Sequence, residues 1–436
     1  MSLFNNKKDT AATGKNTTNN ETPQLFQETA APGQDALSMN PEDEVNLYAQ
    51  GRAKQISLDP RKRTITALAG ITILVFFLSC TLPTNVFDVS SRADRSLATL
   101  LAEFSSQAQA FLGVFTGGES LFSMHVWEVA AALIAGAALA VSGGVYQGSL
   151  KNALAGPSTL GVTSGATLGL IIYAVFAYNG LYSGDLSSYQ DYLNTLPLSD
   201  YIMTMYGSFL CSLLGCFLVV GVVLAIAYVA GADKVSNASV VIAGQVFAAV
   251  ISVVLTWLRY YIEQTTNDAA VAELLTQVQN SSFNGAYNLQ SVLVFGLPTL
   301  ACIIAIFLLS PRLSLLSFDA DEARSMGISV NGTRIGMVAL CTTLTALTIS
   351  FVGPLGFVGF MMPHLARRLV GPDFRYLLPA AALLGAILIT AVHYVATLGI
   401  PGFVTGNTGT FTSIVGSIAF LCLIMRRKGV HSADWL

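Results

Sequence analysis

Residues 353–373 read GPLGFVGFMMPHLARRLVGPD, and the topology of the whole chain depends on this stretch. Its apolar part, 354–366, is shorter than the roughly 20 residues that a helix needs to cross a bilayer. Glycine and proline residues interrupt it, which favours a broken or tilted helix over a regular span. Arg367 and Arg368 follow directly. Whether this segment crosses the membrane therefore decides on which side its neighbours lie.

The composition around this stretch is that of a membrane protein. Hydrophobic residues make up 53% of the 436 residues and charged residues only 11%, against about 25% charged in a soluble domain. The charges are also uneven, since 16 of them lie in residues 1–63. The remainder cannot cover a water-exposed surface with polar groups, which excludes a soluble globular protein. The net charge of −3 offers no basic field for nucleic acid.

Nine further apolar runs are expected to cross the membrane: 64–82, 129–148, 159–178, 206–230, 239–258, 291–309, 335–352, 376–396 and 411–425. Positive residues concentrate in cytoplasmic loops, so Lys and Arg test the topology. With 354–366 counted as a span, 19 of them fall on the inner side and 3 on the outer side. This distribution predicts ten spans with both termini in the cytoplasm.

Three regions follow from this pattern. Residues 1–60 are hydrophilic, have no apolar period and are predicted to form a disordered cytoplasmic tail. Residues 61–428 form the transmembrane domain, and 429–436 form a short cytoplasmic C-terminal tail. The six cysteines fall inside predicted spans and make no CxxC pair, so neither disulfides nor a metal site is expected.

Ionisable side chains are scarce in the predicted spans. His125 and Glu128 lie at the outer end of the second span and His393 in the outer half of the ninth, whereas the middle of every span lacks Asp, Glu, Lys and Arg. Proton or ion coupling relies on such groups, so an ion-coupled secondary transporter is weakened but remains an alternative. His393 is interpreted as a hydrogen-bonded packing residue. The chain also lacks a GxxxxGKS/T phosphate loop, so ATP-driven transport would need a separate ATPase.

The longest inner loop, 310–334, contains a short helix signal. Asp319 followed by Glu322 resembles a capping box, and Gly327 supplies a C-terminal stop. The pattern predicts a helix over 320–326 with a polar face and with Met326 on the other side. Two interpretations stay open: a solvated connector on the membrane surface, or an element that docks into a groove on an ATPase.

Three blocks of the chain resemble one family, the FecCD-type permeases, which are membrane subunits of ABC importers for iron-siderophore complexes, haem and cobalamin. Residues 313–327 (LSLLSFDADEARSMG) are similar to the family's LNLLSLG-EE-ARSLG loop. Residues 144–166 (GVYQGSLKNALAGPSTLGVTSGA) resemble GxxxQxxxxNPLAxPxxLGxxxGA, and 353–373 resemble GPIGFVGLIVPHIARRLVGPD. The similarity runs from about residue 60 to 428 with the blocks in the family's order.

The resemblance implies an all-α fold, that of a type II ABC importer permease with about ten transmembrane helices in the bacterial cytoplasmic (inner) membrane. Residues 61–428 become the permease domain and 313–330 the coupling loop, with these ATPase-coupling residues: Asp319, Asp321, Glu322, Arg324, Ser325 and Gly327. The motif residues expected to pack the fold are Gly144, Gln147, Asn152, Pro157, Gly161, Gly165, Gly353, Pro354, Gly356, Gly359, Pro363, His364, Arg367, Arg368, Gly371, Pro372 and Asp373. Gln147 is the one polar side chain of its block that is a candidate for lining a path.

The function implied by the resemblance is that of a permease subunit in an ATP-driven importer, with iron-siderophore complexes as the leading substrate and haem or cobalamin as alternatives. The implied partners are a second permease subunit, two cytoplasmic ABC ATPases and an extracytoplasmic substrate-binding protein. We expect no catalysis, metal or cofactor in the chain itself, because ATP and Mg²⁺ would bind to the ATPases.

The chain departs from the family pattern at three points. Residues 125–128 read HVWE where the family has RLPR, whose arginines are associated with docking of the binding protein. The remaining outer cations, which are the weak docking candidates, are Arg92, Arg95 and Arg259. Asp319 replaces a family glycine, and 406–410 (GNTGT) replaces a Glu-containing PVG segment. These departures favour one half of a heterodimeric permease, although a divergent homodimer is possible.

Overall fold

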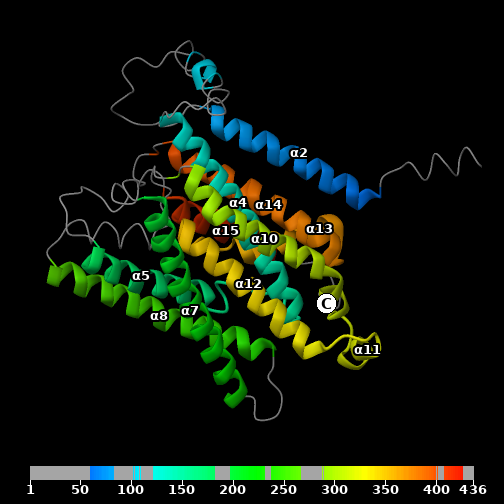
Figure 1. Ribbon diagram of the computed structural model, residues 1–436. Coiled ribbons are helices and arrows are strands. Elements are labelled where there is room, and N and C mark those ends of the chain that lie inside the picture. The colour runs from blue at the N-terminus through cyan, green and yellow to red at the C-terminus, as the bar shows by residue number, and fades with distance from the viewer. Residues whose placement is uncertain are drawn as a thin grey trace, which may run out of the picture. The chain divides into compact units, whose positions relative to one another are not determined.

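The computed structural model describes residues 59–82, parts of 102–109, 121–181, 197–230, 237–266, 287–398 apart from 288, and 400 and 407–425. Every regular element in these ranges is a helix (Figure 1). The helices are α2 (Pro60–Thr81), α4 (Leu121–Ser149), α5 (Val162–Leu181), α7 (Leu198–Ala230), α8 (Asn237–Thr266), α10 (Leu289–Leu315), α11 (Ala320–Ser325), α12 (Val330–Val352), α13 (Val358–Val370), α14 (Phe374–Thr397) and α15 (Thr408–Met425). The predicted disordered tail lies outside the described residues except at its last two positions, and 429–436 lie outside them entirely.

Each of the ten predicted spans falls on one of these helices, and α11 is the additional short helix predicted in the coupling loop. Seven of the described helices are long and apolar enough to cross a membrane: α2, α4, α7, α8, α10, α12 and α14. α5 and α15 are shorter apolar helices. α13 has only 13 residues, as expected for the segment interrupted by glycine and proline. The predicted all-helical membrane fold is therefore confirmed.

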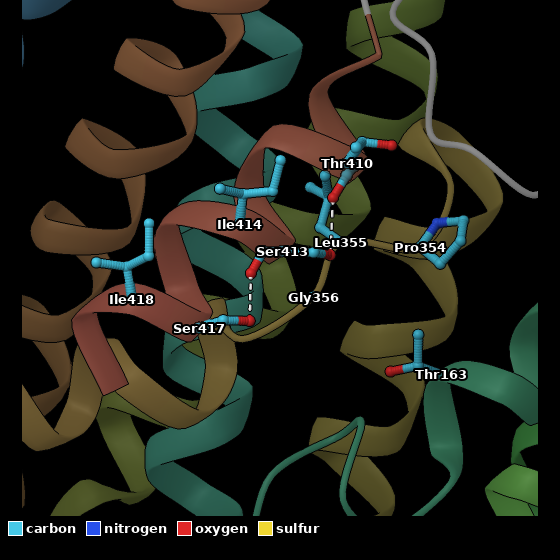
Figure 2. A pocket seen from close by; sticks show the side chains of 10 residues that line it. Thr163, Pro354, Leu355, Gly356, Thr410, Ser413, Ile414, Ser417 and Ile418 are labelled. Carbon is cyan, nitrogen blue, oxygen red and sulfur yellow. Dashed lines mark hydrogen bonds between the residues drawn. The ribbon is translucent and has the colours of Figure 1, made fainter. Parts of the chain in front are cut away.

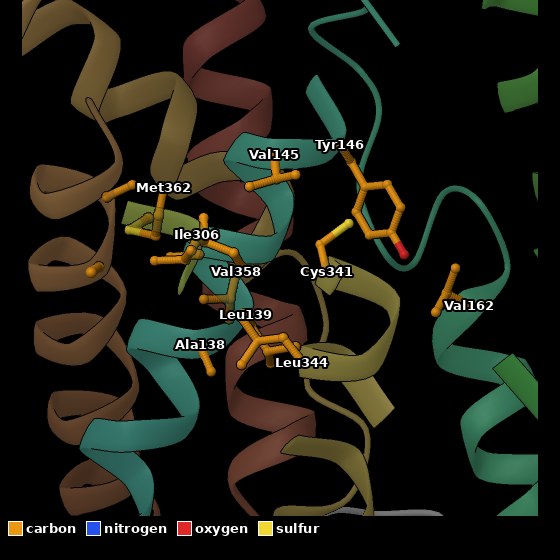
Figure 3. Packing of buried hydrophobic residues seen from close by; sticks show 14 of the residues in the cluster. Ala138, Leu139, Val145, Tyr146, Val162, Ile306, Cys341, Leu344, Val358 and Met362 are labelled. Carbon is orange, nitrogen blue, oxygen red and sulfur yellow. The ribbon is translucent and has the colours of Figure 1, made fainter. Parts of the chain in front are cut away.

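The centre of the described fold is α4, which packs against α2, α10, α12, α13 and α14. Of its most apolar stretch, 78% is buried inside the protein. Alanine and glycine dominate this helix, and small residues let helix backbones approach closely inside a membrane. Figure 3 shows the resulting core, in which side chains from α4 meet those of α10, α12 and α13, among them Val145, Ile306, Leu344 and Met362.

Buried hydroxyl groups add directional contacts to this packing. Ser142 of α4 shares a hydrogen bond of 2.8 Å with Thr345 of α12, and one turn later the Tyr146 hydroxyl shares one of 2.8 Å with Thr342. Such bonds between membrane helices contribute about 0.6 kcal/mol each on average. They therefore fix the register between α4 and α12 more than they stabilise the fold.

α5 packs against α7, and both contact α8 (Figure 1). The α5–α7 contact again depends on glycine, because a methyl group on Gly165 or Gly215 would overlap the backbone of the other. The Ser212 hydroxyl donates a hydrogen bond of 2.8 Å to the carbonyl of Ala166 across the same contact. Gly165 therefore lies where the backbones of α5 and α7 approach each other closely.

Candidate functional site

The connection between α12 and α13 is irregular, and it contains the stretch that the sequence marks as broken. α12 ends at Gly353, whose φ of 77° lies in the left-handed region. Phe357, just before α13, also has a left-handed backbone with φ 62°. This conformation costs a non-glycine residue about 1–2 kcal/mol. Gly416 of α15 packs so closely that a methyl group there would overlap the Phe357 side chain, so neighbouring helices hold the strained turn in place.

An open groove of about 700 Å³ lies beside this connection. One wall is the loop residues Pro354, Leu355 and Gly356, and a second is a face of α15. Figure 2 shows the hydroxyl side chains of Thr410, Ser413 and Ser417 on that face, and Thr163 of α5 on the far side. The remaining lining residues are Gly409, Ile414 and Ile418. Irregular backbone at membrane depth is tolerated where it lines a cavity, and this groove is such a place.

The chemistry of the groove is weakly polar and uncharged. None of the residues that line it carries a formal charge. The Ser413 hydroxyl donates to the Gly409 carbonyl at 2.9 Å and the Ser417 hydroxyl to the Ser413 carbonyl at 2.6 Å. With their hydrogens used inside the helix, these hydroxyls present acceptor lone pairs to the groove. Such a wall offers hydrogen-bond acceptors and apolar surface, and no charged group.

Of the residues that line this groove, the sequence predicts Pro354 and Gly356, as packing residues, and none of the hydroxyl residues of α15. Their spacing of three and four residues was visible as a polar stripe on the last span. The groove itself was not, because its walls come from α5, the α12–α13 connection and α15. Gln147, in contrast, does not line the groove: it is buried, and its amide donates a hydrogen bond of 3.0 Å to the Phe360 carbonyl of α13.

The three sequence blocks meet around the second half of α4. A methyl group on Gly143 would overlap the carbonyl of Gly359, which joins the first block's helix to the third block. Pro157 packs against the same glycine, 2.8 Å from where a Cβ would stand. Residues from the coupling loop reach this contact as well, because Leu313 lies against Gly148. The blocks therefore form one packed unit, although more than 150 residues separate the first from the third.

The turn between α4 and α5 carries Asn152, Pro157 and Gly161. The Asn152 side chain accepts a hydrogen bond of 2.9 Å from the Leu154 amide, and the Pro157 carbonyl accepts one of 2.9 Å from the Val162 amide. Gly161 has φ +72°, and Gly244 of α8 packs against the backbone next to it. The predicted helix break is therefore present, with α4 ending at Ser149.

The end of the third block joins α13 to α14. Gly371 has φ +88° and ends α13, and Pro372 follows. The Asp373 carboxylate then caps α14, accepting from the Arg375 amide at 3.0 Å and from the Ser314 hydroxyl at 3.3 Å. Pro363 and His364 are buried in α13, Arg367 is half-buried and Arg368 is exposed. Asp373 thus links this turn to the start of the coupling loop.

α11 lies in the coupling loop, beyond the ends of α10 and α12 (Figure 1). Asp319 is its N-cap residue, but its side chain makes no capping hydrogen bond, so the predicted capping box is absent. Gly327 ends the element with φ +82°, as predicted. Met326 is 44% exposed, and the residue that anchors α11 is Ala323, at 1% exposure. The expected apolar side is therefore supplied by Ala323.

The other side chains of α11 are exposed on the protein surface. Asp321, Glu322, Arg324 and Ser325 are all exposed, and Arg324 pairs with Asp321 at 2.9 Å. Phe318 is also exposed, while its carbonyl accepts a hydrogen bond of 2.6 Å from the Lys151 ammonium group at the end of α4. An exposed helix with charged and apolar side chains, anchored through Ala323, is suited to docking.

The three arginines predicted to lie on the outer side are only partly covered by the structure. Arg92 and Arg95 lie outside the described residues. Arg259 is half-buried near the C-terminal end of α8. The geometry therefore places one docking candidate at the end of a helix.

The groove, the irregular connection between α12 and α13, and the exposed coupling loop are features of a polytopic membrane transport subunit. The model of the FecCD transport family matches residues 66–426, so the chain belongs to that family. A probable siderophore transport system permease, YfhA of Bacillus subtilis (strain 168), is 30% identical over 324 residues, covering 74% of this chain and 86% of the relative. The hemin transport system permease HmuU of Yersinia pestis is 30% identical, covering 71% and 85%.

The fold is also that of a solved transporter. A metal-chelate type ABC transporter in an inward-facing conformation matches with a TM-score of 0.61 and 24% identity, covering 84% of this chain and 99% of that one. At this identity the match supports the fold alone. Together with the family, it makes the chain a permease subunit of an ABC importer of the FecCD type.

Proposed function

We propose that the chain is one permease subunit of an importer of iron-siderophore complexes in the bacterial inner membrane, with both termini in the cytoplasm. Its complex would contain a second, different permease subunit, two cytoplasmic ATPases that bind ATP and Mg²⁺, and an extracytoplasmic binding protein. Haem and cobalamin are the alternative cargoes. The observation that carries the proposal is the exposed coupling loop.

The coupling loop connects a solvent-exposed surface to the packed centre of the protein. α11 exposes Asp321, Glu322 and Arg324, whereas the stems on both sides, α10 and α12, pack against α4 and against each other. Lys151 and Asp373 bond the loop to the turns that end α4 and begin α14. A push on α11 is therefore transmitted to the helices next to the groove, since packed helices shift as units.

The groove is suited to a bulky cargo that needs no charged partner in the protein. A lining of hydroxyl groups, isoleucines and bare backbone makes many weak contacts and places no fixed charge in the path. An iron chelate surrounds its metal with the ligand's own donor atoms, so the path does not have to supply a ligand to the iron. The names of the siderophore and hemin relatives add weight to metal chelates as a class, and the siderophore choice rests on the commonest cargo of the family.

The proposal of a second permease subunit is supported by the exposed face of α15 along the open groove. The groove is open, and Thr410, Ile414, Ser417 and Ile418 of α15 are exposed on that side. A path for a polar solute needs a wall on every side, because lipid would otherwise fill the opening. We infer a different partner rather than a second copy because the sequence has lost the RLPR-like arginines that the family uses for the binding protein. In a heterodimer the partner could supply them, with Arg92, Arg95 and Arg259 secondary.

Uptake into proteoliposomes that hold the whole complex tests the energy source. Vesicles loaded with ATP should accumulate the iron-siderophore complex supplied with its binding protein, and vesicles loaded with a non-hydrolysable analogue should not. An intact proton and sodium gradient is maintained in both. Continued uptake with the analogue would refute the ABC mechanism and support the ion-coupled alternative, for which the His125–Glu128–His393 group would be the candidate ionisable site.

A charge reversal tests the docking surface. Glu322→Arg should abolish co-purification of the ATPase, because it inverts a charge on the exposed face of α11. Asp200→Arg is the matched control, since Asp200 is also an exposed acid but lies in the first turn of α7. Co-purification that survives Glu322→Arg would contradict the assignment of α11 as the docking element.

A further inference from the structure

His125, Glu128 and His393 converge at the end of α4 that is opposite the coupling loop. His125 and Glu128 lie one turn apart near the start of α4, and His393 reaches them from the last turns of α14. One ligand-type atom from each lies within 4.8 Å of the others. His393 is fully buried, and the Glu128 and His125 side chains keep 10% and 17% of their surface exposed. The group is therefore inside the fold yet reachable through His125.

The distances within the group are close to those of a metal site without its ion. Glu128 Oε2 lies 3.6 Å from His125 Nδ1 and 3.8 Å from His393 Nε2. Both separations are too long for good hydrogen bonds. Bonds of 2.0–2.2 Å from one zinc ion place tetrahedral ligand atoms about 3.3–3.5 Å apart. Shifts of a few tenths of an ångström would close these two pairs around a cation, and the ligand nitrogens of His125 and His393, which lie within 4.8 Å of each other, would have to approach with them.

The far nitrogen of each ring is already held in place. His125 Nε2 lies 3.0 Å from the Ser79 carbonyl at the end of α2, and His393 Nδ1 lies 3.1 Å from the Thr408 hydroxyl at the start of α15. Histidines that bind metals commonly have such an oxygen partner on the other ring nitrogen, which fixes the tautomer and the direction of the ligating lone pair. Four helices therefore contribute to the arrangement.

The hydrogen bond between His125 Nε2 and the Ser79 carbonyl determines which form of the other ring nitrogen, Nδ1, lies toward Glu128. A carbonyl oxygen can only accept, so Nε2 of His125 carries the hydrogen, and Nδ1 of the neutral ring presents a lone pair. That lone pair and the carboxylate oxygen of Glu128 are 3.6 Å apart. Two electron-rich atoms at this partly buried place are stabilised by a metal cation between them.

We propose that His125, Glu128 and His393 bind one divalent transition-metal ion of the zinc class, a site beyond the importer function proposed above. Two imidazoles and one carboxylate suit Zn²⁺ and its neighbours rather than Mg²⁺ or Ca²⁺, which prefer all-oxygen sites. Three protein ligands leave a coordination position for water or an exchangeable ligand. The ion ties the start of α4 to the end of α14, and through Ser79 and Thr408 to α2 and α15.

The site is tested on the full chain purified with a histidine-free tag, stripped with EDTA and titrated with Zn²⁺ alone. The wild-type chain should bind one Zn²⁺ by calorimetry, and Co²⁺ in its place should give the visible absorption bands of a site with nitrogen and oxygen ligands. Zn²⁺ should also raise the thermal midpoint. His125→Asn and Glu128→Gln should weaken binding at least tenfold and remove that stabilisation, whereas His431→Asn should bind as the wild type does.

Glu128→Gln keeps the shape of the side chain and therefore folds even if a His393 variant does not. Absence of stoichiometric binding by the wild-type chain would overturn the proposal. So would unchanged Zn²⁺ affinity in both His125→Asn and Glu128→Gln, because the ion would then sit elsewhere, for example on cysteines. In either case the group would be a packing cluster that holds no metal ion.

Discussion

Single glycines decide how closely the helices of this protein approach. Gly136 of α4 and Gly385 of α14 face each other so that a methyl group on either would overlap the carbonyl of the other. Gly70, on the exposed side of α2, has no atom within 4 Å of the place where a Cβ would stand. The same residue type is therefore required at one position and replaceable at the other.

We predict opposite effects for one substitution at these two positions. Gly385→Ala places a methyl group 2.6 Å from the Cβ of Ala140 and should destabilise the fold by about 1–3 kcal/mol, the usual cost of overpacking. Gly70→Ala should be neutral or stabilising by up to about 1 kcal/mol, because alanine is the better helix former. Thermal unfolding in detergent measures both, and equal midpoints would contradict the close approach of α4 and α14.

The hydroxyl pair of Tyr146 and Thr342 gives a second prediction at this scale. Tyr146→Phe and Thr342→Val each remove one half of their 2.8 Å hydrogen bond. A double-mutant cycle on unfolding should return a coupling energy of about 0.6 kcal/mol, with about 1.7 kcal/mol as the upper end for membrane helices. Strictly additive single effects would show that the two hydroxyls do not act together.

Among the elements, α11 has the least packing of its own and depends most on its ends. Six residues are too few for a stable isolated helix. Its start lacks a side-chain cap, so its end and the anchor at Ala323 hold it. Gly327 makes that end possible, because its φ of +82° is open to glycine and unfavourable for a branched residue.

We therefore predict that Gly327→Val uncouples transport from ATP hydrolysis. No atom lies within 4 Å of the place of its Cβ, so the effect would come from the backbone alone, at a cost of about 1–2 kcal/mol. Gly327→Asn is the control at the same position, since asparagine tolerates the left-handed region. ATP-driven uptake should fall in the valine variant and persist in the asparagine variant. Equal loss in both would mean that side-chain space, not backbone conformation, matters here.

For the whole molecule, the sequence predicted those features that depend on residues close together in the chain, such as helix positions and helix ends. Apolar runs placed the ten described helices other than α11, glycine with proline predicted the break before α13, and Gly327 predicted the end of α11. The capping box failed because Asp319 has the backbone of a cap without the side-chain bond. Met326 was misplaced because a helix of under two turns has no clear apolar face, and the small Ala323 sufficed as anchor.

Sites assembled from distant segments could not be predicted in this way. Thr163 and Ser417 lie on opposite sides of one groove, yet no sequence pattern relates them. His393 alone is typical of a packing residue, and only the approach of α14 to α4 brings it to His125 and Glu128. The long-range contacts of the fold, rather than its helices, thus carry the functional information.

Because the groove joins these distant segments into the proposed path, water should reach it in the assembled complex. Cysteines introduced one at a time at Thr410, Ser413 and Ser417, in a background in which Cys211, Cys302 and Cys422 are replaced by Ser, should react with a water-soluble maleimide. The thiolate forms only where water is present, and the native cysteines that remain are buried. Val415→Cys is the control, because Val415 is exposed on α15 but does not line the groove. The iron chelate should protect the three groove positions. Labelling of Val415→Cys at the same rate would mean that all exposed faces of α15 are equally hydrated, and that the groove is no path.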